Sequence, residues 1–279
     1  MSIHPSEALK LCKRCSRMAP QSHDYCSRCG SHSWVDAPSG ISQATSPTAG
    51  YGGQLGIAPW TIGDLARGIG FFTAQAFTIF LMFILATLLI EDANLGLYAL
   101  VVVTLILEGV LLATVWIFAV AKYRISWRAL GLWRLPNAGD VILAGSVFLV
   151  GIGVQVGYLT ILRLIGVDTG RVTPSTFIEE GGVVLVLLSI LALAVAPVAE
   201  EIFFRGFIFG GAATRYGFMK GALASAALFS IAHIEPLKFL PLFVLGFLLA
   251  WIYHKTGALW GSMIAHLLNN ALVLVVILT

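Results

Sequence analysis

Residues 182–209 have the sequence GVVLVLLSILALAVAPVAEEIFFRGFIF, and this stretch decides the class of the fold. The run from Gly182 to Ala199 contains no charged residue. A helix needs about 20 apolar residues to cross the hydrocarbon core of a bilayer. The stretch therefore predicts a transmembrane helix, and the two glutamates near its end, Glu200 and Glu201, need a separate explanation.

The rest of the chain is also rich in apolar residues and poor in charged ones. Of its 279 residues, 58% are hydrophobic and 11% are charged, whereas a soluble domain is about 45–50% apolar and about 25% charged. This composition excludes a soluble globule, a disordered chain and a coiled coil. Six further apolar runs predict spans at residues 68–90, 95–121, 140–165, 219–234, 237–254 and 257–278. We therefore expect an all-α polytopic membrane protein with about seven transmembrane helices.

Lysine and arginine predict the orientation of these spans, because cytoplasmic connections are enriched in both residues. They gather before the first predicted span and in the second, fourth and sixth connections, whereas the alternate connections are mainly acidic. The N-terminus is then cytoplasmic and the C-terminus lies outside. Residues 1–10 contain no apolar segment of the kind found in signal peptides. We expect an integral protein of the bacterial plasma membrane.

All four cysteines lie near the N-terminus, as Cys12-Lys-Arg-Cys15 and Cys26-Ser-Arg-Cys29. Two CxxC pairs can bind one tetrahedral zinc ion through four thiolates. The alternative is two disulfides, which a reducing cytoplasm disfavours. The four ligands would fill the zinc shell, so the predicted metal is structural. The segment resembles a zinc ribbon of the kind often attached to bacterial membrane proteins.

Composition divides the chain into three parts. Residues 1–37 form the predicted zinc ribbon, which would bind a cytoplasmic partner. Residues 38–59 are rich in Gly, Ser, Pro, Thr and Ala, carry no charge and predict a flexible linker. Residues 60–279 form the predicted transmembrane domain. We find no nucleic-acid-binding motif and expect no nucleic-acid partner.

Ionisable residues inside spans are costly, so each indicates a function. Glu201 and Arg205 are four residues apart and can form an ion pair on one helix face. Glu200 lies about 100° around the helix and is free to act as a general base. Pro197 tends to kink the helix just before them. The alternative interpretation is a cluster of charges at a helix end near the membrane interface.

Two further motifs carry histidines within predicted spans: Phe229-x-x-x-His233 and His266-x-x-x-Asn270. His266 and Asn270 share a helix face and can donate to one oxyanion. The alternative is that these polar groups only join helices through hydrogen bonds. Glu108 in the second predicted span and Arg163 near the end of the third could pair across helices; alternatively, Arg163 could extend its charged end to the membrane surface.

The three motifs, in this order, resemble those of the CAAX protease and bacteriocin-processing (CPBP, or ABI) family of intramembrane proteases. The resemblance covers residues 180–275, and Glu-Glu-x-x-Phe-Arg-Gly at residues 200–206 is matched in full. It implies that Glu200 activates a water, that His233 positions this water, and that His266 and Asn270 form the oxyanion site. Glu201 and Arg205 would hold the geometry, and Phe229 belongs to the second motif.

The family is often labelled metalloprotease. An alternative therefore has Glu200, His233 and His266 bind a catalytic zinc, and we favour the metal-free mechanism. The expected activity is endopeptidase cleavage of a membrane-associated protein or peptide. Two other functions stay open: a non-catalytic immunity or scaffold protein, and a proton-coupled transporter that uses Glu200 and His233.

Overall fold

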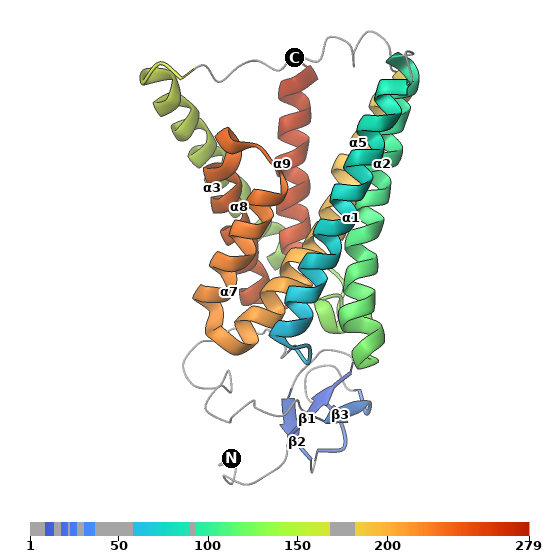
Figure 1. The fold of residues 1–279 in the computed structure, drawn as a ribbon. Coiled ribbons are helices and arrows are strands. Elements are labelled where there is room, and N and C mark those ends of the chain that lie inside the picture. Colours follow the sequence, from blue (N-terminus) through green and yellow to red (C-terminus); the bar gives the residue numbers. More distant parts are fainter. Residues whose placement is uncertain are drawn as a thin grey trace.

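The protein consists of a small antiparallel sheet and a bundle of long helices. Figure 1 shows the sheet below one end of the bundle. The computed structural model describes residues 9–13, 18–21, 23–26, 31–36, 58–89, 93–167 and 182–278.

The sheet comprises β1 (Leu9–Cys12), β2 (Met18–Pro20) and β3 (Trp34–Asp36). The strand β1 lies between β2 and β3 and pairs antiparallel with both. All three strands fall within residues 1–37, the segment predicted to be a separate module.

Two of the predicted zinc ligands, Cys12 and Cys26, are buried and pack with Trp34 and with Trp133 of the helical part. The backbone N–H of Ser126 also donates to the carbonyl of Lys13 (3.4 Å). The sheet therefore contacts the connection that follows the second predicted span. Cys15 and Cys29 lie outside the described residues, so the zinc site stays a prediction.

The helical part begins at the end of the predicted linker, where Ala58 is already buried against the bundle and its N–H donates to Thr214 Oγ1. Its elements, in chain order, are α1 (Ile62–Leu89), α2 (Ala93–Val115), η2 (Trp116–Ala121), η3 (Trp127–Leu130), α3 (Ala138–Leu164), α5 (Gly182–Ile190), η4 (Leu191–Val195), α6 (Ala196–Glu200), η5 (Glu201–Phe209), α7 (Gly210–Ala232), η6 (Pro236–Lys238), α8 (Phe239–Thr256) and α9 (Trp260–Leu278). Of these, η2, η4 and η5 are π-helical, and η3 and η6 are 3₁₀ helices.

Five helical segments among the described residues are long and apolar enough to cross a membrane: Ile62–Leu89, Gly96–Ala121, Ala138–Leu164, Gly182–Ala232 and Pro236–Thr256. Their outer faces are apolar as well, since Phe77 and Ile142 are each 68% exposed and Leu164 is 80% exposed. Such faces suit contact with lipid. The prediction of an α-helical polytopic membrane protein is confirmed.

The count of seven spans stays a prediction. The segment Gly182–Ala232 has 51 residues, about 76 Å at 1.5 Å per residue, which far exceeds a bilayer core of about 30 Å. The helix breaks at Gly217, where φ is 81° and ψ is 170°. The predicted spans 182–209 and 219–234 lie on either side of this break. The last predicted span falls on an apolar helix, Trp260–Val276, that is shorter than the others.

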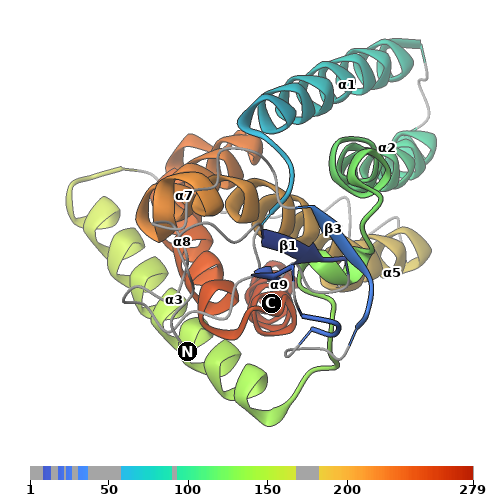
Figure 2. The ribbon, with the colours of Figure 1, turned by 90° about the horizontal axis from the view of Figure 1, so that it is seen from below.

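The helix α9 lies in the middle of the bundle and contacts α3, α8, α6 and η4. Figure 2 shows α1 and α2 at one edge of the molecule and α3 at another, with α9 between them. Any side chain that α9 directs towards α6 is therefore enclosed by several helices.

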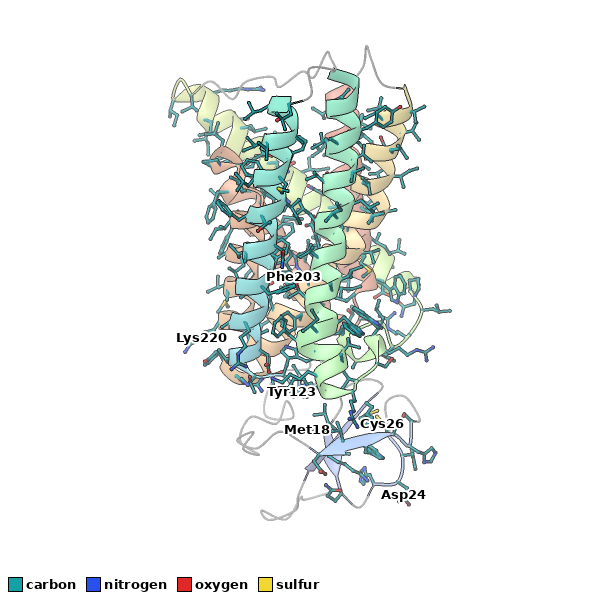
Figure 3. The ribbon with its side chains drawn as sticks, turned by 45° about the vertical axis from the view of Figure 1, so that its right-hand side comes forward. Met18, Asp24, Cys26, Tyr123, Phe203 and Lys220 are labelled. Atoms are coloured by element: carbon teal, nitrogen blue, oxygen red, sulfur yellow. The ribbon has the colours of Figure 1, made fainter. Side chains whose placement is uncertain are left out.

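One buried charge ties α1 to the end of η2. Asp64 is fully buried, and its carboxylate contacts Lys122 Nζ at 2.5 Å. The hydroxyl of Tyr123 donates to Asp64 Oδ2 at 2.6 Å. Figure 3 shows Tyr123 and Lys220 at the end of the helices nearest the sheet. Two connections predicted to be cytoplasmic thus meet at one end of the bundle, and their orientation in the membrane stays a prediction.

Candidate active site

Glu200 and Glu201 lie where the helix changes between α and wider π turns. In η4, the N–H of Ala196 donates to the carbonyl of Leu191, five residues back. The next donor in that register would be Pro197, which has no N–H. The carbonyl of Ala192 is therefore left without its backbone donor, about two helical turns before the two glutamates.

Asn270 of α9 supplies the missing donor. Its Nδ2 donates to the carbonyl of Ala192 at 2.9 Å. The bond joins α9 to the wide turn and fixes the Asn270 side chain within the bundle. One of its two amide N–H groups is used in this way, and the second can serve a ligand. The predicted oxyanion role of Asn270 stays a prediction.

The predicted ion pair between Glu201 and Arg205 is present. Arg205 Nη1 donates to Glu201 Oε1 at 2.7 Å, and both side chains are fully buried. Arg205 Nη2 also donates to the carbonyl of Gly246 at 3.3 Å. Gly246 also lets α8 pack closely on α7, because a Cβ there would lie 3.0 Å from the Cα of Ala226. The arginine thus joins η5 to α8.

The imidazole of His266 lies between the two glutamates. Its Nδ1 is 3.0 Å from Glu201 Oε1, and its Nε2 is 3.9 Å from Glu200 Oε2. An ionised carboxylate can only accept, so Nδ1 carries the proton and donates to Glu201. Nε2 then faces Glu200 across a gap that one water can bridge.

Phe229 is the common neighbour of the remaining site residues. The guanidinium carbon of Arg205 lies 4.3 Å from the centre of its ring. Its ring centre is 5.6 Å from that of His266, in a T-shaped arrangement, and 4.6 Å from that of His233. His233 Nδ1 is 2.7 Å from the carbonyl of Phe229, so Nδ1 donates there and Nε2 keeps its lone pair.

The three motifs predicted from the sequence therefore come together, but not all through direct bonds. Glu200, Glu201, Arg205 and His266 form a chain of polar contacts. Within the described ranges, no hydrogen bond or ion pair joins His233 to Glu200 or His266. His233 is half-buried, and the ring of Phe229 packs between it and His266. Figure 3 shows Phe203, two residues after Glu201, inside the bundle and away from both of its ends.

Buried polar atoms without a hydrogen-bond partner gather at this place. Five such side-chain atoms occur in the part of the chain that the structure describes, and four belong here: Glu108 Oε2, Glu200 Oε2, Glu201 Oε2 and Arg205 Nε. Native proteins leave few buried polar groups unpaired, and those that remain call for a water, an ion or a catalytic role.

Glu108 does not form the ion pair with Arg163 that was one of the two interpretations of its sequence position: none of the described residues forms an ion pair with it, and Arg163 is exposed. The helix α2 that carries Glu108 contacts α6 and η5. The sequence singles Glu108 out, because a lone carboxyl in an apolar span is costly. Nothing in the sequence tells which partner it faces.

The alternative of a catalytic zinc depends on how the possible ligands are grouped. No group of three His, Cys, Asp or Glu side chains that could bind a metal ion is found in residues 58–89, 93–167 and 182–278 or in the described part of the sheet. His266 turns Nδ1 to Glu201, and His233 turns Nδ1 to the carbonyl of Phe229, so each keeps Nε2 available, as zinc-ligating histidines also do. The described side chains therefore do not gather into a three-ligand zinc site, although the two histidines are oriented as such ligands would be.

Residues 182–272 match the family described as Type II CAAX prenyl endopeptidase Rce1-like. A protein of Bacillus subtilis (strain 168) named "Putative membrane peptidase YdiL" is 37% identical over 90 residues, which is 32% of this chain and 36% of that protein. The chain thus matches about a third of the length of this curated relative. No solved structure matches the chain.

The region of similarity contains every motif residue of the site, from Glu200 to Asn270. It excludes the sheet, the predicted linker and the first three predicted spans. Glu108 lies outside it, so the similarity gives this residue no role.

Proposed function

We propose that this protein is an intramembrane endopeptidase of the CAAX protease and bacteriocin-processing family. It would hydrolyse a peptide bond of a membrane-associated protein or peptide, with Glu200 as the general base. One observation carries the proposal: Glu200 has a buried, unpartnered oxygen 3.9 Å from a histidine whose other nitrogen is held by a second carboxylate. The family similarity of residues 182–272 supports the same reaction.

In the proposed reaction, a water lies between Glu200 and the substrate carbonyl. Glu200 takes one proton from the water, and the oxygen attacks the carbonyl carbon. His233 would orient the water, because its Nε2 keeps a lone pair that can accept a hydrogen bond. Enclosure by the helices excludes bulk water and strengthens each electrostatic contact.

The tetrahedral intermediate carries a negative oxygen. His266 can donate to it from Nε2 when the ring is protonated, and Glu201 then stabilises the positive ring as the aspartate of a serine-protease triad does. The second N–H of Asn270 is the other proposed donor. Glu200 finally gives its proton to the leaving nitrogen as the carbon–nitrogen bond breaks, which yields a carboxylic acid and an amine.

This reaction uses no catalytic metal. We expect purified protein in detergent to keep its cleavage rate after incubation with a chelator and removal of the chelated metal. Loss of cleavage that added zinc restores, in wild type and equally in Cys12→Ser, which lacks the proposed ribbon zinc, would support the metal-dependent alternative.

The orientation of the chain in the membrane decides from which side a substrate reaches the site. We place the N-terminus in the cytoplasm of a bacterium and the C-terminus outside, and the substrate beside the bilayer.

The sheet would be a zinc ribbon that binds a cytoplasmic partner. Metal analysis of purified protein should show one zinc lost in Cys12→Ser, whereas Ser33→Ala should keep it. Equal zinc content in both variants would contradict the ribbon.

The decisive experiment compares peptide termini in cells that carry wild type, Glu200→Gln or Glu235→Gln. Glu235 is an exposed control, since it lies in a surface pair with Lys238. We expect the new termini of wild type to persist with Glu235→Gln and to disappear with Glu200→Gln. Identical termini in all three strains would contradict the protease. Full complementation by Glu200→Gln would favour the scaffold instead.

A further inference from the structure

Three side-chain amides, Gln155, Asn269 and Asn270, form a hydrogen-bonded network that joins α3 and α9 to the π turn η4. Gln155 Nε2 on α3 donates to Asn269 Oδ1 at 3.5 Å, and Asn269 Nδ2 donates to Asn270 Oδ1 at 3.5 Å. Asn270 Nδ2 then donates to the carbonyl of Ala192 at 2.9 Å. All three bonds of this amide network run in one direction, from α3 through α9 to η4.

The direction of the amide network follows from its last acceptor. A backbone carbonyl can only accept, so Asn270 must turn Nδ2 to Ala192, and its Oδ1 then faces away. Asn269 must offer an N–H to that oxygen, which leaves its own Oδ1 as the acceptor for Gln155. Because Pro197 leaves the Ala192 carbonyl without a backbone donor, the backbone of η4 sets the orientation of all three amides.

Asn270 needs a second contact, because its own torsion does not orient its amide. Rotation of an asparagine amide about the Cβ–Cγ bond is broad and roughly twofold. The bond from Nδ2 to Ala192 holds one atom and still lets the amide plane turn. A bond at Oδ1 fixes this plane, in which the free N–H of Asn270 also lies. The bond from Asn269 therefore decides where the proposed oxyanion donor points.

Packing alone does not require the two outer amides. Asn269 is 8% exposed on a helix that contacts α3, α8 and α6, and Gln155 is half-buried within the apolar span Ala138–Leu164. Each amide has a desolvation cost that an apolar residue would avoid. Hydrogen bonds between membrane helices add little stability, and apolar packing would join α3 to α9 as well. The two amides thus indicate a role at the site.

We propose that Asn269 and Gln155 are positioning residues for the oxyanion donor: Asn269 fixes the amide plane of Asn270, and Gln155 holds Asn269 in place. Their action passes through Asn270 and not through contact with the reacting atoms. Gln155 lies outside residues 182–272, the region of family similarity. The inference rests on the proposed function for its catalytic meaning, whereas the amide network itself does not depend on it.

The activity test uses purified full-length protein and a membrane peptide that it cleaves. Asn269→Leu removes both bonds of this amide, and Gln155→Met removes the outer donor but keeps a side chain of similar length. Since loss of a whole oxyanion donor lowers kcat by about 100-fold or more, misdirecting one in Asn269→Leu should lower kcat by about tenfold, with KM nearly unchanged. Gln155→Met should show a smaller fall. The control Thr160→Val, which loses only a bond to the carbonyl of Val156 within α3, should keep the wild-type rate.

The Asn270→Ala background separates positioning from a general structural role. Without the amide of Asn270, Asn269 has no donor to orient, so Asn269→Leu should cause no further fall in the remaining kcat. An equal fall in both backgrounds would mean that Asn269 acts on the fold as a whole, which overturns the proposal. A wild-type kcat in Asn269→Leu would overturn it too.

A second measurement needs no activity. Residues that share a hydrogen bond are energetically coupled. In denaturant unfolding in detergent, the stability lost in Gln155→Met should therefore be smaller in the Asn269→Leu background than in wild type. Equal losses would contradict the amide network. If the losses are coupled while wild type cleaves no peptide, the proposed function fails and the amide network stands.

Discussion

The side-chain amide of Asn270 donates to the backbone carbonyl of Ala192 at a distance of 2.9 Å. The carbonyl is available because Pro197, five residues further on, has no N–H to offer in the π-helical register. A π-helical turn inside an α-helix often marks a functional site. Here the turn lies one short α-helical segment, Ala196–Glu200, before Glu201, and the bond of Asn270 joins it to α9, which carries His266.

The bond between Asn270 and Ala192 predicts that Asn270 and Pro197 are energetically coupled. Asn270→Ala should destabilise wild type, because a buried carbonyl loses its donor. In Pro197→Ala, the new backbone N–H can bond to that carbonyl, so the same change should cost less. A double-mutant cycle of unfolding free energies should give a coupling of about 0.5–3 kcal/mol. Additive effects would mean that Pro197 does not leave the carbonyl open.

The ion pair of Glu201 and Arg205 should be costly to break. Arg205→Met leaves a buried carboxylate without its cation, and such changes cost about 3–5 kcal/mol. Denaturant unfolding in detergent would measure this loss. The matched control is Lys238→Met in the surface pair with Glu235, whose side chains are 61% and 50% exposed; it should cost about 0–1 kcal/mol. Similar losses for the two variants would contradict the structural role of the buried pair.

Phe229 should support catalysis without contacting the reacting atoms. Its ring packs against His233, His266 and the guanidinium of Arg205. Phe229→Leu keeps an apolar side chain but removes the flat ring, so both imidazoles lose their orientation. We expect kcat/KM to fall by about tenfold, which corresponds to about 1.4 kcal/mol. Phe243→Leu, in the separate stacked pair with Phe239, should retain activity. Equal activity in the two variants would exclude this role.

Tyr123 should make stability depend on pH at the alkaline end. Burial and the hydrogen bond to Asp64 raise the pKa of Tyr123 to about 12, from about 10 in an unfolded chain. A raised pKa in the folded state means that the stabilisation is complete below pH 10 and is lost as the pH rises to about 12. The difference in Tm between wild type and Tyr123→Phe should therefore stay constant up to pH 10 and shrink above it. A difference that is unchanged up to pH 12 would contradict the contact.

The amino-acid sequence by itself determined those features that depend on composition and on the spacing of residues along the chain. Apolar runs predicted the membrane helices because crossing a bilayer requires length and low polarity. Glu201 and Arg205 could be paired from their spacing alone, and the order of the three motifs indicated the family similarity that residues 182–272 show. These features are local, so a single stretch of sequence contains them.

The tertiary structure decided the relationships between distant residues. It directed Asn270 to the carbonyl of Ala192, set His266 between two glutamates and placed the ring of Phe229 between His233 and His266. It also packed α2, which carries Glu108, against α6 and η5, and left Glu108 without an ion pair among the described residues. Spacing along the chain cannot predict such contacts, because they depend on how helices pack around one another and on which face each turns inward.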